Sequence, residues 1–523
     1  MIMDLAKIKK IYMIGIKGVG MTMLAQFLAS KGYDVSGSDT AEVFMTDQVL
    51  ARFGIKVNQG FNTDNLPAGA DLIIYSSAYN AETNVEVARA MAGKIKTLTY
   101  AEVLGEIFNQ MYGIAVCGSH GKTTTTAWLG YVLMKAGLKP NVLVGARVEQ
   151  FDGAGTYGDS DYLVIEADEY QNKLKYYNPK AVLLNNIDHD HHDFFPTEES
   201  YVDAFVKFIE KIPKKGFLVT NFDDPIIAKI ANVNCRGKII TYALNREDVN
   251  FFAYDIKQQG LKQFFKVRYC ENNNYPLERP AFAKATARQR VAAARGTALS
   301  NEAQPLLKGL DVVGGVSVSE TEELGDFSIS LTGKHNVYNA LAVIAASIEL
   351  SVALKDIRTY LGEFSGTDRR AKILGKFNGA TIIDDYGHHP TEIRATLAGL
   401  RAAYPDQKII AVFHPHTFTR TKALLNEFAQ SFSDADKVIV LDIYGSAREK
   451  HGGVSSLDLI EKMKEYEENK PAFAKATVGK NFVHVHDLLE CEKYLRETVE
   501  RGQVIVLIGA GDVFRVGEAL VNG

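Results

Sequence analysis

A glycine-rich loop between an apolar run and a threonine-rich run has the residue types that hold a phosphate group. Residues 113–128 read GIAVCGSHGKTTTTAW, which predicts a short buried strand, a loop and a helix that begins near Lys122. In such a unit, backbone N–H groups and the positive end of the helix face the anion, the lysine reaches the outer phosphates, and the threonine hydroxyl ligates Mg²⁺. Val116 stands where the standard spacing has its first glycine, so an ordinary turn is the alternative. We expect ATP to bind here, with contacts from Gly118, Ser119, His120, Gly121, Lys122, Thr123 and Thr124.

Acidic residues and histidines follow two predicted strands of the same block. A strand at 162–165 ends in EADE (166–169), and a strand at 181–184 is followed by NNIDHDHHD (185–193). Parallel strands end at one edge of a sheet, so these side chains are expected to ligate a Mg²⁺ that accompanies ATP. The histidines leave a transition-metal site open, because imidazole suits zinc. An ATP-linked metal is favoured because the phosphate loop supplies the anion.

A second glycine turn lies near the N-terminus. A predicted strand at 11–16 leads into Gly15-x-x-Gly18-x-Gly20 and a helix to about residue 29, and a second strand ends at Asp39. This is a nucleotide-binding opening in which the acid is placed to meet a ribose or a base. The dinucleotide fingerprint needs a third glycine where Met23 stands, which argues against a nicotinamide cofactor.

Polar residues also end the predicted strands of the last third of the chain. Strands at 380–383, 409–413, 438–441 and 504–508 are followed by DDYGHHP (384–390), HPHTFTR (414–420), IYGSAR (443–448) and GAGD (509–512). Because parallel strands end on the same side of a sheet, these segments predict one catalytic edge.

Length and composition bound the fold and the compartment. A chain of 523 residues is too long for one hydrophobic core and is expected to form about three domains. Its net charge of −4 indicates neither a polyanion nor a membrane surface as a partner. The four scattered cysteines, the glycine-interrupted N-terminal apolar run and the lack of a span-length apolar run predict a cytoplasmic protein.

The heptapeptide PAFAKAT occurs twice, at 280–286 and at 471–477. The first copy continues into a tract with five basic and no acidic residues from Arg279 to Arg295. Two distant copies are not a tandem repeat array. Exposed insertions in loops are favoured over a nucleic-acid-binding tail.

Taken in order, the motifs resemble those of the Mur ligases of peptidoglycan synthesis, and among them the members that join UDP-N-acetylmuramate to L-alanine. The matching segments are GIKGVGM, GYDVSGSD, GSHGKTTTT, EADE, NNIDHDH, GKHNVYNA, DDYGHHPTEI, HPHTFTRT and YGSAREK. The resemblance covers the chain apart from the two insertions. It implies a Rossmann-like UDP-sugar domain (1–108), a central P-loop ATPase domain (109–365, insertion near 276–315) and a Rossmann-like C-terminal ligase domain (366–523, insertion near 469–480).

The resemblance also implies roles for individual residues. The implied contacts with the UDP-sugar are Gly15, Gly18, Val19, Gly20, Asp39 and Ser77, and the implied metal ligands are Thr123, Glu166 and His191. The implied further contacts with ATP are His335, Asn336, Asn339, Arg370 and Asp385. The implied contacts with the amino acid are Tyr386, His388, His416 and Arg420. Lys122, His191, His388 and Arg420 are the expected catalytic residues, with His388 either a general base or a residue that orients the substrate. The chain departs from the family pattern at Lys17, Ala371 and Thr417.

The implied reaction is ATP-dependent formation of an amide through an acyl phosphate. Two alternatives remain open, one with the same chemistry on a different substrate and one from a different class of protein. One is a related ligase that attaches a recycled tripeptide to UDP-N-acetylmuramate. The other, from a different class, is a P-loop NTPase switch, which leaves the polar residues at the last four strand ends unexplained. No protein partner or nucleic acid is expected.

Overall fold

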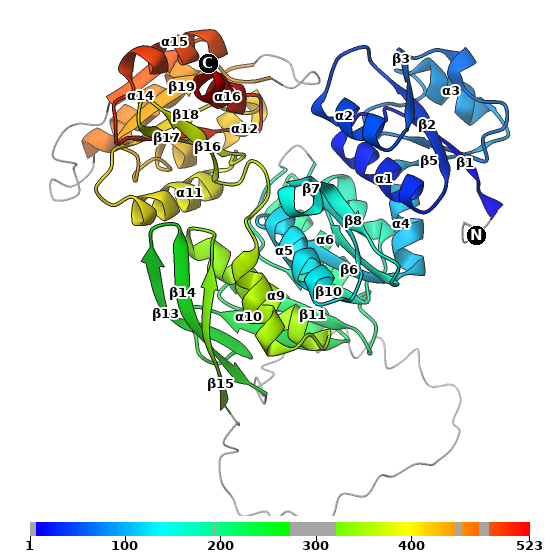
Figure 1. The fold of residues 1–523 in the computed structure, drawn as a ribbon, viewed down its shortest axis with the longest axis horizontal. Coiled ribbons are helices and arrows are strands. Elements are labelled where there is room, and N and C mark those ends of the chain that lie inside the picture. The colour runs from blue at the N-terminus through cyan, green and yellow to red at the C-terminus, as the bar shows by residue number, and fades with distance from the viewer. Residues whose placement is uncertain (1–6, 192–193, 272–320, 446–451, 470–480) are drawn as a thin grey trace, which may run out of the picture.

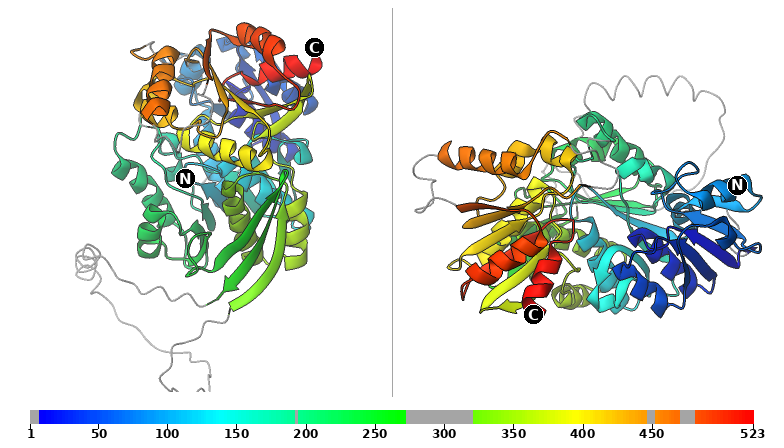
Figure 2. Two further views of the ribbon diagram at one scale, coloured as in Figure 1. Left: turned by 90° about the vertical axis from the view of Figure 1, so that its left-hand side faces the viewer. Right: turned by 90° about the horizontal axis from the view of Figure 1, so that it is seen from above.

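The computed structural model describes residues 7–191, 194–271, 321–445, 452–469 and 481–523, which form three sheets in chain order (Figure 1). Helices flank each sheet, and the three blocks lie around a central region where loops from the middle and C-terminal blocks approach each other (Figure 2). The expected α/β class is therefore confirmed. Most of both PAFAKAT insertions lies outside the described residues. The same holds for residues 446–448, the end of the polar segment expected after the strand at 438–441.

The N-terminal block is a five-stranded parallel sheet in the order β3-β2-β1-β4-β5. The first strand is shorter than the sequence predicts, because Gly15 has a φ of 77° and turns the chain where the N–H groups of Gly15 and Ile16 both reach the carbonyl of Ser38. The elements are β1 (Lys10–Ile14), α1 (Val19–Ser30), β2 (Asp34–Asp39), α2 (Met45–Arg52), β3 (Lys56–Gln59), β4 (Leu72–Tyr75), α3 (Val85–Ala92), β5 (Lys96–Thr99) and α4 (Tyr100–Gln110).

The middle block is a ten-stranded sheet in the order β15-β14-β13-β12-β11-β10-β6-β9-β7-β8. Its parallel centre carries the phosphate loop after β6, and the pairs β13–β14, β14–β15 and β7–β8 are antiparallel. The elements are β6 (Tyr112–Cys117), α5 (Lys122–Lys135), β7 (Asn141–Val148), β8 (Gly153–Tyr157), β9 (Tyr162–Glu166), β10 (Ala181–Leu184), α6 (Glu198–Ile209), β11 (Phe217–Asn221), α7 (Pro225–Asn234), β12 (Lys238–Ala243), β13 (Phe251–Gln259), β14 (Lys262–Cys270), β15 (Thr321–Ile329), α9 (Lys334–Glu349) and α10 (Leu354–Glu363).

The C-terminal block is a six-stranded sheet in the order β16-β17-β21-β18-β19-β20, parallel except for β16. The strands expected at 409–413 and 504–508 form with those bounds as β18 and β21. The elements are β16 (Lys372–Phe377), β17 (Ala380–Asp385), α11 (Pro390–Ala403), β18 (Ile409–Phe413), α12 (Phe418–Ala423), α13 (Leu425–Ala429), β19 (Lys437–Leu441), α14 (Ser456–Asn469), β20 (Asn481–Val485), α15 (Leu488–Thr498), β21 (Val504–Ile508) and α16 (Phe514–Asn522).

Hydrophobic packing joins the first two blocks and leaves the third separate. One buried cluster runs from Ile11 in the first sheet to residues of the middle sheet such as Leu184, and Phe27 of α1 meets Tyr157 of β8 with ring centroids 6.2 Å apart. The two apolar clusters of the C-terminal block contain only residues from 371 onward. Nonpolar burial therefore fixes the first block on the second, whereas the third is held to the second mainly by polar contacts.

Within the described residues, none of the helices has the length and apolar character needed to span a bilayer.

Candidate active site

The phosphate loop is built by two glycines in left-handed or otherwise strained conformations. Gly118 has a φ of 122° and Gly121 a φ of 78°, a region that residues with a Cβ rarely occupy. A Cβ at Gly118 would lie 2.7 Å from the carbonyl oxygen of Asn186, and one at Gly121 would lie 2.6 Å from Oδ1 of Asn339. Both positions therefore need glycine, for backbone conformation and for space.

Lys122 is folded back onto its own loop. Its Nζ donates hydrogen bonds to the carbonyls of Gly118 (2.7 Å) and Ser119 (3.1 Å) and forms a 3.1 Å ion pair with Glu169, whose side chain is 1% exposed. Burial would lower the pKa of Lys122, but the charges of Glu169, Asp168 and Glu166 raise it above its ordinary value, so the lysine is fully charged.

The acidic strand end after β9 faces the start of α5. Thr123 donates a 2.9 Å hydrogen bond from Oγ1 to Glu166, whose other oxygen accepts from the backbone N–H of Gly145 at 2.9 Å. A Cβ at Gly145 would approach a carboxylate oxygen of Glu166 to 2.6 Å, so a larger residue here would displace that carboxylate. The structure thus brings the predicted metal ligands Thr123 and Glu166 together.

The third predicted metal ligand, His191, lies beside different acids. Its Nε2 is 3.8 Å from Glu169, and one ligand atom each from Asp168, Glu169 and His191 lie within 4.8 Å of one another. His191 has a φ of 55° and its ring packs on Tyr170 at 4.6 Å between centroids. Two sets of oxygen-rich ligands therefore flank the phosphate loop, and their carboxylates and hydroxyl suit Mg²⁺.

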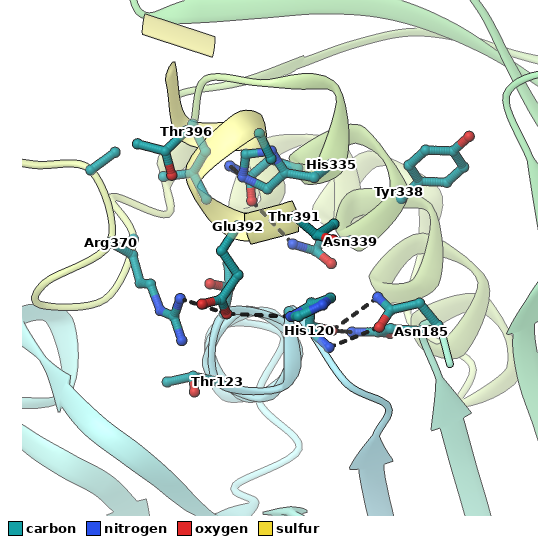
Figure 3. A pocket seen from close by; sticks show the side chains of 18 of the residues that line it. His120, Thr123, Asn185, His335, Tyr338, Asn339, Arg370, Thr391, Glu392 and Thr396 are labelled. Carbon is teal, nitrogen blue, oxygen red and sulfur yellow. Dashed lines mark hydrogen bonds and ion pairs between the residues drawn. The ribbon is translucent and has the colours of Figure 1, made fainter. Parts of the chain in front are cut away.

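A cavity of 290 Å³ opens between the phosphate loop, α9 and the start of α11 (Figure 3). Nine of the twelve predicted ATP contacts line it, and Gly118, Ser119 and Lys122 do not. Those nine residues are His120, Gly121, Thr123, Thr124, His335, Asn336, Asn339, Arg370 and Asp385. Side chains that the sequence did not single out complete the wall, among them Asn185, Tyr242, Tyr338 and Glu392. The cavity has contributions from the middle and C-terminal blocks, which meet here.

His120 is held between carboxylates of the two blocks. Its Nε2 lies 3.1 Å from Asp188 and its Nδ1 lies 3.4 Å from Glu392 of α11, as Figure 3 shows for Glu392. Burial would lower the pKa of His120, but hydrogen bonds to the two carboxylates raise it to about 9. Asp188 also accepts a 2.8 Å hydrogen bond from Thr391 of α11. A charged His120 thus links the phosphate loop to the C-terminal block.

Asp385 shapes the loop that carries Arg370. Its buried carboxylate accepts 2.8 Å hydrogen bonds from the backbone N–H groups of Ala371 and Gly387. Ala371, which stands where the family has an aromatic residue, has a φ of 47° and lines the cavity. Arg370 reaches Glu392 at 3.4 Å. Asp385 therefore positions Arg370 indirectly, through its hydrogen bonds to the backbone of the loop that carries the arginine.

The rings of three residues expected to hold the amino acid lie near one another, and the fourth residue, Arg420, pairs with the middle block. Ring centroids of Tyr386 and His388 are 5.4 Å apart, those of His388 and His416 are 6.5 Å apart, and Arg420 lies 3.5 Å from Asp190 of the middle block. Burial lowers the pKa of His388 to about 4, so its ring is neutral near pH 7.

Thr417, another departure from the family pattern, has a φ of 71°. Its Oγ1 accepts from the backbone N–H of Arg420, which caps the short helix α12. Thr417 therefore fixes the start of the helix that carries Arg420.

In the N-terminal turn, Asp39 accepts hydrogen bonds from the backbone N–H groups of Lys17 (2.7 Å) and Thr40 (2.8 Å). Lys17 is buried and pairs with Asp47 at 3.0 Å. Lys17, which stands where the family often has glycine, therefore adds an ion pair that stabilises the turn. Val19 and Ser77, by contrast, are exposed beside the turn, as a ligand site requires.

Sequence reasoning did not single out Glu392, and it expected Asp188 only as one of several acids near a metal and not as a partner of His120. Both lie in segments that it did single out, DDYGHHPTEI and NNIDHDH, at a helix start and after a strand. The sequence did contain a signal for Glu392: it is a carboxylate in the first turn of a predicted helix, directly after one of the polar strand ends.

Comparisons with known proteins agree with this arrangement. Three family models match: Mur ligase family, catalytic domain (residues 10–112), Mur ligase middle domain (116–295) and Mur ligase, glutamate ligase domain (369–511). The chain is 36% identical over 516 residues to a protein of Desulfitobacterium hafniense named UDP-N-acetylmuramate–L-alanine ligase, covering 98% of this chain and 99% of that one. It is 35% identical to a protein of the same name from Caldanaerobacter subterraneus, covering 99% and 98%.

A solved structure shares the fold over the same length. The crystal structure of UDP-N-acetylmuramate–alanine ligase from Thermotoga maritima is 24% identical and aligns over 98% of both chains with a TM-score of 0.73. With matching models in all three blocks and curated relatives of this identity over the full length, this chain belongs to the Mur ligase family.

Proposed function

We propose that this protein uses ATP to join the carboxylate of UDP-N-acetylmuramate to the amino group of L-alanine, with release of ADP and phosphate. The full-length relatives carry this activity in their names. The observation that carries the proposal is the cavity between the phosphate loop and the C-terminal block, because one wall suits ATP and the other includes Glu392, which lies 3.5 Å from His388 after β17.

The chemistry follows from the weakness of a carboxylate as an acylating group. A carboxylate oxygen of the sugar attacks the γ-phosphorus of ATP, the bond to the ADP oxygen breaks, and an acyl phosphate forms. The amine of L-alanine then attacks the carbonyl carbon and phosphate leaves, so that the amide forms and the amine loses a proton. Phosphoryl transfer of this kind depends on positioning and charge neutralisation.

The chain offers three cations around the transferred group. Lys122 must leave the carbonyls of its own loop to reach the phosphates, whereas Arg370 and the charged His120 already line the cavity. Thr123 and Glu166, with Asp168, Glu169 and His191 beside them, would hold Mg²⁺, which would neutralise phosphate charge when bound.

His388 fits an orienting role for the incoming amine. Its pKa of about 4 makes it a poor acceptor for the proton of an ammonium group, since Brønsted behaviour favours a base whose pKa lies near the working pH. A neutral ring beside Tyr386 and His416 can instead accept a hydrogen bond and direct the amine.

The UDP-sugar is proposed to bind at the turn that contains Gly15, Gly18, Val19 and Gly20, next to Ser77. The cytoplasm is the proposed compartment, and the four free cysteines support it because disulfides are rare there.

Substrate dependence tests the proposal. ADP release by the purified protein should require UDP-N-acetylmuramate and L-alanine together, and each substrate alone should give only background. A mixture in which a peptide beginning with L-alanine replaces the free amino acid distinguishes the tripeptide-joining alternative. ADP release that needs neither substrate would identify an NTPase switch and overturn the proposal.

A further inference from the structure

One aspartate and two histidines gather at the edge of the six-stranded sheet, and none of them lines the cavity. Asp442 directly follows β19, His484 lies on β20 and His486 directly follows β20. One ligand atom from each of the three residues can be chosen so that all three atoms lie within 4.8 Å of one another. The remaining two clusters of this kind among the described residues contain His120 or His191 and belong to the candidate active site.

The pairing of the two strands produces this cluster. Strand β20 pairs with β19 in parallel, with Leu441 opposite Val485, so the next residues, Asp442 and His486, emerge side by side. His484 and His486 are two residues apart in extended chain and therefore point to the same face. Because one partner is on a strand and the other two adjoin strand ends, the backbone holds the three side chains in a defined arrangement.

The distances suit a shared cation. Nε2 of His484 is 2.8 Å from Oδ1 of Asp442, Nδ1 of His486 is 3.4 Å from Oδ2, and the two ring centroids are 4.8 Å apart. Neighbouring ligand atoms in a tetrahedral zinc site lie about 3.3 Å apart, given zinc–nitrogen distances of about 2.0–2.1 Å. Without a cation, each ring nitrogen lies within hydrogen-bonding reach of the carboxylate; with a cation bound between them, each neutral ring would carry its proton on its other nitrogen.

Chemistry and exposure identify the class of ion. Two imidazole nitrogens and one carboxylate oxygen favour zinc and similar transition metals over Mg²⁺, which prefers oxygen ligands. His484 is 17% exposed and anchors the site, whereas Asp442 and His486 are 55% and 71% exposed. The open side gives the ion an entry route and leaves room for a water ligand.

We propose that Asp442, His484 and His486 bind one zinc-class divalent cation, which ties the edge strand β20 to the segment after β19. The same segment contains Tyr444, whose ring stacks on His416 with centroids 5.6 Å apart and planes 15° apart. A cation on Asp442 therefore also steadies the chain next to the predicted amino-acid contacts.

Calorimetric titration of the full-length protein with ZnCl₂ tests the site, with MgCl₂ and a non-hydrolysable ATP analogue present so that the active-site clusters are engaged. The wild type should bind one equivalent that Asp442→Asn and His486→Ala each weaken by at least about 100-fold, since even outer-shell partners of a metal contribute about 10–100-fold. Both replaced side chains are exposed, so the fold is retained. Glu497→Gln, an exposed acid on α15 of the same block, is the matched control and should leave the isotherm unchanged.

Two further measurements separate this site from zinc bound elsewhere. Co²⁺ in place of Zn²⁺ should give visible absorption bands that disappear in His486→Ala, and zinc should slow amide hydrogen exchange at residues 442–444 and 484–486. Wild-type and variant proteins with the same zinc isotherms, or exchange that slows only around His120 and His191, would overturn the proposal.

Discussion

At the scale of single residues, the site is a set of charges that neutralise one another before any ligand is bound. Glu169 holds Lys122, and Glu392 holds both Arg370 and His120. Each cation is therefore kept charged and in place in a partly buried setting, where an unpaired charge would be costly. An entering triphosphate competes with these carboxylates for the same cations.

Replacing Lys122 by alanine should reduce turnover by at least about 100-fold, the usual cost of removing one group that stabilises developing charge in a transition state. UDP-sugar binding, measured by calorimetry, should stay unchanged because the first block folds around its own turn. Lys135→Ala, at the exposed C-terminal end of the same helix, is the control and should keep activity. Normal turnover in Lys122→Ala would remove the phosphate-loop assignment.

The charged His120 makes stability depend on pH. Its pKa is about 9 in the folded protein and about 6.5 in the unfolded chain, so its contribution is complete below pH 6.5 and is lost as the pH rises through 9. His120→Gln should therefore lower the free energy of unfolding by about 2 kcal/mol at pH 6, and by much less at pH 10, because hydrogen bonds to charged groups contribute about 1.5–3 kcal/mol. Urea unfolding of both proteins at the two pH values measures this. A difference that stays the same at both would contradict the raised pKa.

At the scale of elements, the candidate site depends on how the N-terminus of α5 meets α9. Gly121 is the left-handed residue that begins α5, and the position of a Cβ there is taken by the side-chain amide of Asn339. Buried apolar residues of α5, such as Ala127, and of α9, such as Ala340, belong to one hydrophobic cluster, so the two helices pack in the same core. The phosphate loop is therefore held by neighbouring structure as well as by its own sequence.

Gly121→Ala should abolish ATP binding, because the added methyl group both strains the backbone and displaces Asn339. Gly137→Ala is a matched control: it follows the other end of α5, has a φ of 84°, and its Cβ would have open space. Both variants should lose about 1 kcal/mol or more of stability from the left-handed conformation. Only Gly121→Ala should lose binding of a fluorescent ATP analogue, and equal binding in both variants would contradict the packing argument.

The sequence predicts elements with strong local signals better than those defined by distant pairing. Buried apolar runs gave the strands at 181–184, 409–413 and 504–508 with their bounds. The antiparallel strands β13, β14 and β15 were missed, since charged and polar residues interrupt their apolar residues and no continuous buried apolar run marks them. The phosphate loop could be predicted because its glycines, lysine and threonines are adjacent in the sequence. The contact of His120 with Glu392, more than 270 positions later, could not be predicted, because sequence spacing does not show which loops meet.

At the scale of the whole molecule, the two junctions between blocks differ in kind. A continuous apolar core joins the first block to the second, whereas Thr391, Glu392 and Arg420 of the third block meet the second through hydrogen bonds and ion pairs. Polar junctions of this type permit domain motion. We therefore expect the C-terminal block to move relative to the other two during the reaction cycle.

Replacing Glu392 by glutamine should favour an open arrangement, because it removes the negative charge shared by His120 and Arg370. Small-angle X-ray scattering of the ligand-free protein should then give a larger radius of gyration than for the wild type or for Glu497→Gln. A radius of gyration equal to that of the wild type would show that the ion pairs of Glu392 with His120 and Arg370 do not hold the third block in place.

The account depends most on the claim that ATP activates the sugar carboxylate as an acyl phosphate. The direct measurement uses UDP-N-acetylmuramate with both carboxylate oxygens labelled with ¹⁸O, followed by mass spectrometry of the released phosphate after a single turnover with ATP and L-alanine. The account predicts that each phosphate carries one ¹⁸O and that the amide carbonyl keeps the other. Phosphate without the label would contradict it.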